Sequence, residues 1–263
     1  MRRQPSSRDQ TTAGEDLQVL SNVLEDTPAS EVTRRRLLQT AAAGAAVSAG
    51  GLGVTGVAGA AGESPKRILS TLATAESFGV TFLTEAVKRA PGTPSAGLAD
   101  TLRAANTAEY DHVVALRRLG GRQTTLNFWI PDAAFGGGGA GLFESIETAD
   151  TVELMGYLTG VTAFAKRGNE RAARVLAEAC AIESEHRAIA RFAQTALGGR
   201  TQISIDRSFA PWSIRTVSGM IRALEGAGIG FGEKGAAPGR FYTFPGNPVD
   251  NGSGLRNNGR RPV

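Results

Sequence analysis

Apolar positions recur every three or four residues in four long segments of the chain, and this spacing predicts four amphipathic helices. The predicted helices cover residues 65–89, 95–119, 142–166 and 170–197. Proline and glycine mark their ends: a Pro-Gly-Thr-Pro run begins at Pro91, and glycine pairs begin at Gly120 and Gly198. Each helix has one apolar face to bury, which is what a helical bundle requires.

The lengths of the connections predict how these helices are arranged. Short turns join the first helix to the second and the third to the fourth, so each pair forms an antiparallel hairpin. Residues 120–141 separate the hairpins and contain Pro131 and a run of four glycines from Gly136. We therefore expect an all-α fold, in which residues 62–199 form a four-helix bundle with a long, non-helical crossover between helices 2 and 3. Residues 200–263 are expected to add a short helix within 212–225 and an irregular, basic C-terminal tail.

The N-terminal segment, residues 1–61, has the features of an export leader. Arg34 and Arg35 precede a weakly apolar Gly/Ala-rich stretch that ends at Ala60 in a small-x-small sequence. This pattern resembles a twin-arginine signal, which implies the twin-arginine translocase as a partner during export. The mature protein would then be periplasmic, in the cell envelope or extracellular. An uncleaved membrane anchor is the alternative, although the glycines in the stretch weaken a spanning helix.

The chain contains two histidines, and each follows a glutamate by three residues inside a predicted helix. Glu109 precedes His112 in the second helix, and Glu183 precedes His186 in the fourth. Three residues is slightly less than one helical turn, so each pair lies on one face, and that face carries the apolar stripe. Because buried ionised carboxylates are costly unless they are compensated, the doubled Glu-x-x-His pattern indicates a metal site in the core.

The other two helices each place an acidic residue within the apolar stripe. Glu76 does so in the first helix, and Glu153 is its counterpart in the third, because the sequence Glu-x-x-Gly occurs at both positions. Asp150 lies one turn before Glu153 among bulkier apolar residues and is the alternative ligand from this helix; Glu147 is a third candidate. The predicted metal ligands are therefore Glu76, Glu109, His112, Glu153, Glu183 and His186, with Asp150 as the alternative.

One glutamate from each of two helices and Glu-x-x-His from each of the other two is an arrangement that binds two iron or two manganese ions. In this hypothesis Glu109 and Glu183 bridge the ions, Glu76 and Glu153 are terminal ligands, and each histidine binds one ion. The same oxygen and nitrogen donors suit both metals, so the sequence leaves the choice of metal open. A hydrogen-bonded polar network without metal is the alternative interpretation of these residues.

Residues 65–197 resemble the ferritin-like domain proteins found among exported bacterial proteins. Three stretches carry the resemblance; they begin at Ala75, Glu109 and Asn127 and read AESFGVTFLTEA, EYDHV and NFWIPDA. The resemblance implies a ferritin-like four-helix bundle and, where the ligands are kept, a di-iron centre. Ferroxidases, peroxidases, manganese catalases and oxygenases share this scaffold, so no single activity follows from it.

Charge and cysteine content narrow the classes of function. The chain has 29 lysines and arginines against 25 aspartates and glutamates, and the basic excess lies after residue 199, so the bundle offers no basic face to a nucleic acid. The single cysteine excludes an intramolecular disulfide and a multi-cysteine metal site.

The expected partners are metal ions with oxygen or peroxide. We expect a di-metal oxidase or peroxidase-type oxidoreductase, or else a non-catalytic metal-binding or structural envelope or stress protein. The leader and tail favour a monomer or homodimer over a cage.

Replacement of Arg34 and Arg35 by lysine should retain the protein in the cytoplasm, because the paired arginines are the recognition element of the twin-arginine route. Fractionation of cells that express the parent and the variant measures this. Undiminished export of the variant would contradict the assignment of the leader.

Overall fold

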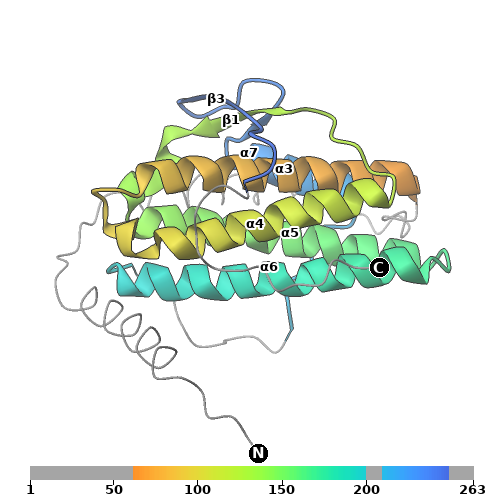
Figure 1. Cartoon of the computed structure of the whole chain (residues 1–263). Helices are drawn as coiled ribbons and strands as arrows, with labels where there is room; N and C mark the ends of the chain where they lie inside the picture. Colours follow the sequence, from red (N-terminus) through yellow and green to blue (C-terminus); the bar gives the residue numbers. More distant parts are fainter. Residues whose placement is uncertain (1–61, 200–208, 249–263) are drawn as a thin grey trace, which may run out of the picture.

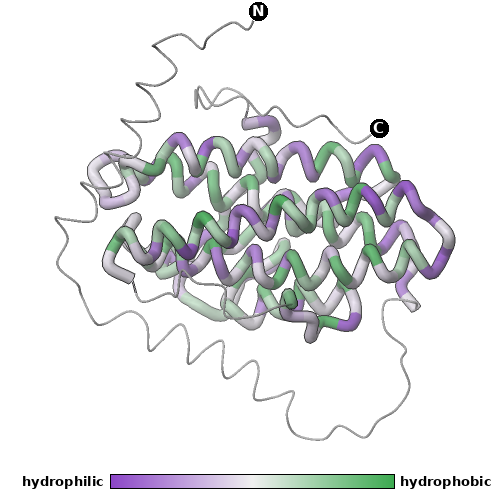
Figure 2. Tube along the Cα trace, turned by 90° about the horizontal axis from the view of Figure 1, so that it is seen from below, coloured by the Kyte–Doolittle hydropathy of each residue, from purple (hydrophilic) through white to green (hydrophobic). Residues whose placement is uncertain are grey.

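The computed structural model describes residues 62–199 and 209–248, and its core is four long helices that lie side by side (Figure 1). They are α3 (Pro65–Arg89), α4 (Ala99–Arg118), α5 (Ala140–Ala165) and α6 (Glu170–Ala196). Polar and apolar residues alternate in short runs along each of them (Figure 2). The predicted helical bundle is confirmed, except that the first residues expected in the second helix form a separate 3-10 helix, η2 (Pro94–Leu98).

Local side chains explain where the helices begin and how the second hairpin turns. The Ser64 hydroxyl accepts the backbone N–H of Arg67 at 3.2 Å at the start of α3. The Asn169 side chain accepts the N–H of Ala172 at 3.0 Å at the start of α6. Between α5 and α6, Gly168 has a φ of +67°, a left-handed conformation that glycine adopts without strain. The chain therefore reverses within four residues, as the short connection predicted.

The crossover and the C-terminal segment form a small antiparallel sheet. Strand β1 (Asn127–Pro131) lies between β2 (Gly230–Phe231) and β3 (Gly239–Thr243), and a 3-10 helix, η3 (Asp132–Gly138), follows β1. The prediction of an irregular tail is wrong for β2 and β3, and the expectation of a crossover without helix is wrong for η3. Each short strand is stabilised by a partner far away in the sequence, about which local periodicity carries no information.

The sheet packs on α3, on the side away from α6 (Figure 1). Phe128 of β1 is fully buried, and its ring centroid lies 6.1 Å from that of Phe78 on α3. Phe231 of β2 lies 5.8 Å from both rings. These aromatic contacts hold the crossover against the bundle and cover the outer side of α3, whose inner side carries Glu76.

Helix α7 (Val217–Gly226) confirms the short helix expected after residue 211, and it packs against α5. Met220 of α7 is fully buried over Gly156 of α5. A Cβ atom at position 156 would lie 2.3 Å from the Met220 sulfur, so any side chain at this position would force the methionine to move. Helix α5 is thus covered by α7 as well as by its bundle neighbours, which accounts for its apolar character around most of its circumference.

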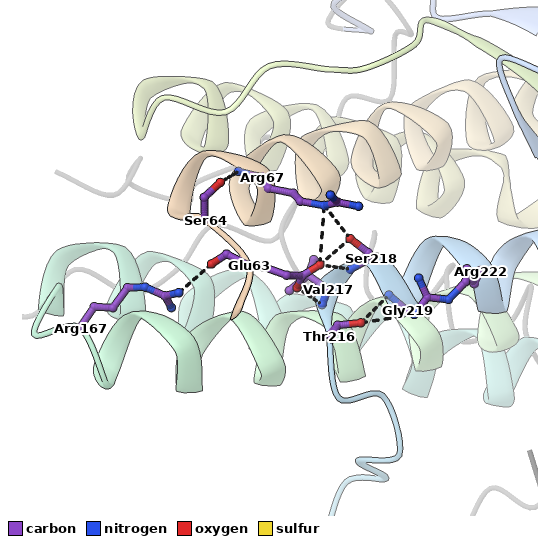
Figure 3. Close-up of polar contacts among 9 residues, drawn as sticks. All are labelled: Glu63, Ser64, Arg67, Arg167, Thr216, Val217, Ser218, Gly219 and Arg222. Carbon is purple, nitrogen blue, oxygen red and sulfur yellow. Dashed lines mark hydrogen bonds and ion pairs between the residues drawn. The ribbon is translucent and has the colours of Figure 1, made fainter. Parts of the chain in front are cut away.

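Glu63, just before α3, connects the start of α3 with the start of α7 (Figure 3). Its carboxylate accepts the backbone N–H groups of Val217 at 2.7 Å and Ser218 at 3.0 Å, and it also accepts the Ser218 hydroxyl. Its backbone carbonyl accepts the Arg167 guanidinium at 2.6 Å. The first N–H groups of a helix have no partner within the helix, so this carboxylate satisfies two of them and complements the helix dipole.

The predicted leader, including the cleavage site near Ala60, lies outside the described residues, as do residues 200–208 and 249–263 of the tail. Within residues 62–199 and 209–248, none of the helices combines the length and the apolar character that crossing a membrane requires.

Replacement of Glu63 by alanine should lower the free energy of unfolding by about 1–3 kcal/mol, because two N–H groups of α7 lose a charged acceptor. Chemical denaturation measures the difference. The control is Glu178→Ala, since Glu178 pairs with Arg174 on the exposed side of α6 and its loss should cost less than about 0.5 kcal/mol. Equal losses for the two variants would contradict the role given to Glu63.

Candidate metal centre

The structure brings all seven predicted ligands together inside the bundle. Each helix supplies at least one of them, and the five carboxylates are each at most 4% exposed. The residues are Glu76 on α3, Glu109 and His112 on α4, Asp150 and Glu153 on α5, and Glu183 and His186 on α6. The apolar stripes of the four helices face one another, so polar residues placed within the stripes meet at the centre.

The side chains form two overlapping donor groups, in each of which one ligand atom per residue lies within 4.8 Å of the others. The first donor group consists of Glu76, Glu109, His112 and Glu183. The second donor group consists of Glu109, Asp150, Glu153 and Glu183. Glu109 and Glu183 belong to both groups, which is the geometry that two neighbouring cations with shared carboxylates require.

The two histidines contact the shared carboxylates of the opposite hairpin. The Nδ1 atom of His112 lies 3.0 Å from Oε1 of Glu183 and 3.2 Å from Oε2 of Glu76. The Nδ1 atom of His186 lies 3.1 Å from Oε1 of Glu109 and 3.7 Å from Oε2 of Glu183. Each imidazole therefore stands beside a carboxylate that both donor groups share.

Several buried polar atoms of this cluster make no hydrogen bond. The contacts of His186 Nδ1 with Glu109 and of His112 Nδ1 with Oε1 of Glu183 are short, but neither has the geometry of a hydrogen bond. The unpartnered atoms are Oε2 of Glu109, Oδ2 of Asp150, Oε1 of Glu153, both carboxylate oxygens of Glu183, and Nδ1 of His186. Buried polar atoms without partners are rare in folded proteins. Cations placed among these atoms would give all of them a partner at once.

Helix α5 contributes two carboxylates, Asp150 and Glu153, to the second donor group. The sequence left the choice between Glu153 and Asp150 open, and the structure places both side chains at the centre. Glu147 is held elsewhere, since it accepts Arg191 Nε at 2.5 Å and Gln194 Nε2 at 2.6 Å. It is therefore not part of the cluster.

Tyr157 and Gly79 support the cluster without belonging to either donor group. The fully buried Tyr157 donates its hydroxyl to Oε1 of Glu76 and so orients that carboxylate. A Cβ atom at Gly79 would lie 3.0 Å from Oε2 of Glu109, so glycine makes room for this shared carboxylate. In the sequence Gly79 marks the repeat, and its position one turn after Glu76 is the signal by which this role could have been found.

Cys180 lies one turn before Glu183 but is not a ligand. Its thiol donates to the backbone carbonyl of Leu154 at 3.8 Å, and burial raises its pKa to about 11. The thiol is therefore protonated at neutral pH. A donor set of carboxylates and imidazoles without a thiolate suits iron or manganese.

Burial and mutual repulsion shift the proton affinities of the cluster. Burial raises the pKa values of Glu76, Asp150 and Glu153, and the negative charges of Glu109 and Glu183 raise them further. The exception is Glu183: burial alone would raise its pKa, but the two histidines lower it to about 2.

The histidines show the complementary effect. Burial alone would lower the pKa of His112 and of His186, but contact with Glu183 and Glu109 outweighs burial and raises both. Without metal, protons therefore neutralise part of the charge of the cluster.

Comparisons of the chain with protein-family models, with curated proteins and with solved structures give no match. The function is therefore inferred from the chemistry of the cluster. Five buried carboxylates face two imidazoles, and this negative charge is close to what two divalent cations neutralise.

The metal-free protein should lose stability as the pH rises from about 5 to 8. A carboxyl or imidazole group whose pKa is raised by folding contributes stability that is fully present below the pKa of the unfolded chain. That stability is lost as the pH rises through the pKa of the folded state. Glu76, Asp150, Glu153 and both histidines all act in this direction.

Thermal melting of the chelator-treated protein across this pH range measures the effect. Glu153→Gln removes one buried proton-binding carboxyl and should flatten the pH dependence, whereas Glu185→Gln, at an exposed position of α6, should leave it unchanged. A melting temperature that rises with pH in the parent would overturn the assignment of raised pKa values.

Proposed function

We propose that this protein is an exported ferritin-like protein that binds two iron or two manganese ions at the buried cluster and reacts there with oxygen or peroxide. The observation that carries the proposal is the pair of overlapping donor groups, with Glu109 and Glu183 common to both. A single ion would leave one group of carboxylates uncompensated in the core. Two ions compensate both groups.

In this proposal the protein side chains hold and separate the two ions. Glu76 and His112 would hold one ion and Asp150 and Glu153 the other, and Glu109 and Glu183 would be shared between them. His186 contacts both bridging residues and completes the ligand set. Tyr157 fixes the Glu76 carboxylate by its hydrogen bond, so the first donor group is the more rigidly held of the two.

When bound, two such ions would each give up one electron, and the two electrons together with two protons would reduce oxygen to peroxide or peroxide to water. The burial of the cluster favours such chemistry because it keeps reactive products away from bulk water. The leader supports the location outside the cytoplasm: the twin-arginine route exports folded proteins, which allows the metal to be loaded first.

The metal content tests the first half of the proposal. Anaerobic titration with Fe(II) or Mn(II) should give about two ions per chain in the parent. Saturating metal should stabilise it by about 3–4 kcal/mol at 100 to 1,000 times the dissociation constant.

Glu183→Gln disturbs both donor groups and should lose both ions and most of this gain. Glu76→Gln leaves the second donor group whole and should keep about one ion. Glu185→Gln serves as the control, because Glu185 lies on the same helix as Glu183 and is exposed. If neither metal changes the melting temperature of the parent, the result would favour the alternative interpretation, in which the cluster is a polar network without metal.

Consumption of oxygen or peroxide tests the second half. The metal-loaded parent should consume the oxidant at least about tenfold faster than Glu183→Gln under the same conditions. An electrode measurement with equal total metal in both samples provides the comparison. Equal rates, with two ions bound by the parent, would identify a non-catalytic metal-binding protein.

A further inference from the structure

A cavity of about 410 Å³ lies inside the bundle against one side of the metal-binding cluster. Glu109, Asp150, Glu153 and His186 line its inner end. All four long helices line the rest, and the side chains there are mainly apolar, among them Phe78, Phe82, Leu102, Ala105, Phe143 and Ile146. Three of the four residues of the second donor group line the cavity, whereas the shared Glu109 is the one residue of the first donor group that does so.

The cavity extends along the bundle axis. On α4 its lining runs from Thr101 to Glu109, and on α6 from Ile182 to Ala190. At 1.5 Å per helical residue, each of these stretches measures roughly 12 Å. Ile189 in the α6 stretch is 45% exposed, so the lining reaches the protein surface between α4 and α6.

The two halves of the bundle differ at this point, although the sequence repeat makes them equivalent. Gly156 on α5 corresponds to Gly79 on α3, and the space over Gly156 is filled by Met220 of α7. Over Gly79 the nearest atoms to a Cβ would be those of the Glu109 carboxylate. Helix α7 thus closes the half of the bundle around Gly156, while the half around Gly79 contains the cavity.

The second donor group is also the less constrained one. Val80 on α3 corresponds in the repeat to Tyr157 on α5, and valine has no hydroxyl to donate. Glu76 receives the Tyr157 hydroxyl, but Oε1 of its counterpart Glu153 is buried without a hydrogen-bond partner. The carboxylates next to the cavity can therefore adjust to a molecule that enters it.

We propose that this cavity binds an uncharged, elongated apolar organic molecule, such as one with an unbranched alkyl chain, with one end beside the second donor group. An apolar cavity of roughly 150 Å³ already admits benzene, so this cavity has room for a molecule more than twice that size. Outside the cluster the charged residue of the lining is Glu185, which is exposed, so a charged group buried among the apolar lining would be uncompensated. That this molecule is the substrate of the metal centre rests on the proposed function, whereas its binding does not.

The binding test uses the metal-free full chain and the neutral fluorescent probe N-phenyl-1-naphthylamine. We expect one saturable site per chain, from which 1-decanol displaces the probe. Ala105→Phe places a ring in the cavity and should weaken binding at least about tenfold. Ala188→Phe adds the same ring at an exposed position of α6 outside the cavity and should leave binding unchanged.

Ala104→Phe is a second filling variant, in case Ala105→Phe does not fold, and circular dichroism reports the helical content of both. Absence of saturable binding to the parent would overturn the proposal. Equal binding by the parent and by a folded filling variant would also overturn it, because the probe would then lie elsewhere.

The position beside the metal is tested with Mn(II)-loaded protein. Addition of 1-decanol should change the electron paramagnetic resonance spectrum of the parent but not that of the folded filling variant. An unchanged parent spectrum, with 1-decanol bound and two ions present, would overturn the placement of the molecule at the second donor group. Probe binding without any metal binding would instead overturn the proposed function and leave the binding site standing.

Discussion

The structure depends on one electrostatic constraint: five carboxylates and two imidazoles lie inside a helical bundle whose other core residues are apolar. Each isolated buried carboxylate would destabilise the fold, so the cluster must be neutralised from within. Protons and the two histidines do part of this, as the raised pKa values of Glu76, Asp150 and Glu153 indicate. The four helices are consequently placed so that their polar positions coincide at one level, and this fixes the register of one hairpin against the other.

The same constraint explains the residues that surround the cluster. Gly79 leaves room for the Glu109 carboxylate, and Tyr157 donates to Glu76. Outside the bundle, the sheet covers α3 and α7 covers α5, so the two helices that carry Glu76 and Glu153 are supported from behind. The cluster thus lies between two opposing hairpins. The hairpins differ in what covers them: the sheet packs on α3, and α7 packs on α5.

The helices and the cluster could be predicted from the sequence because both follow from the spacing of residues that lie close together in the chain. Periodicity of three to four residues located the four helices, and the offset of three residues in Glu109–His112 and Glu183–His186 placed both pairs on buried faces. The choice between Asp150 and Glu153 could not be made, since both lie within one turn on the same side of α5 and both side chains belong to the cluster. The strands β1 and β3 were missed because their pairing joins residues far apart in the chain. The cavity was missed because it depends on the side that α7 leaves open.

The pairing of β1 with β3 has a consequence for the order in which the chain can fold. The middle strand of the sheet lies in the crossover, but its partner β3 ends at Thr243 and is synthesised after all four bundle helices. A nascent or truncated chain that ends before residue 239 would present the β1 edge unpaired, with free backbone N–H and C=O groups next to the buried Phe128. Such an edge is a template for pairing with another chain, and the pairing of β1 with β3 removes it from the complete fold.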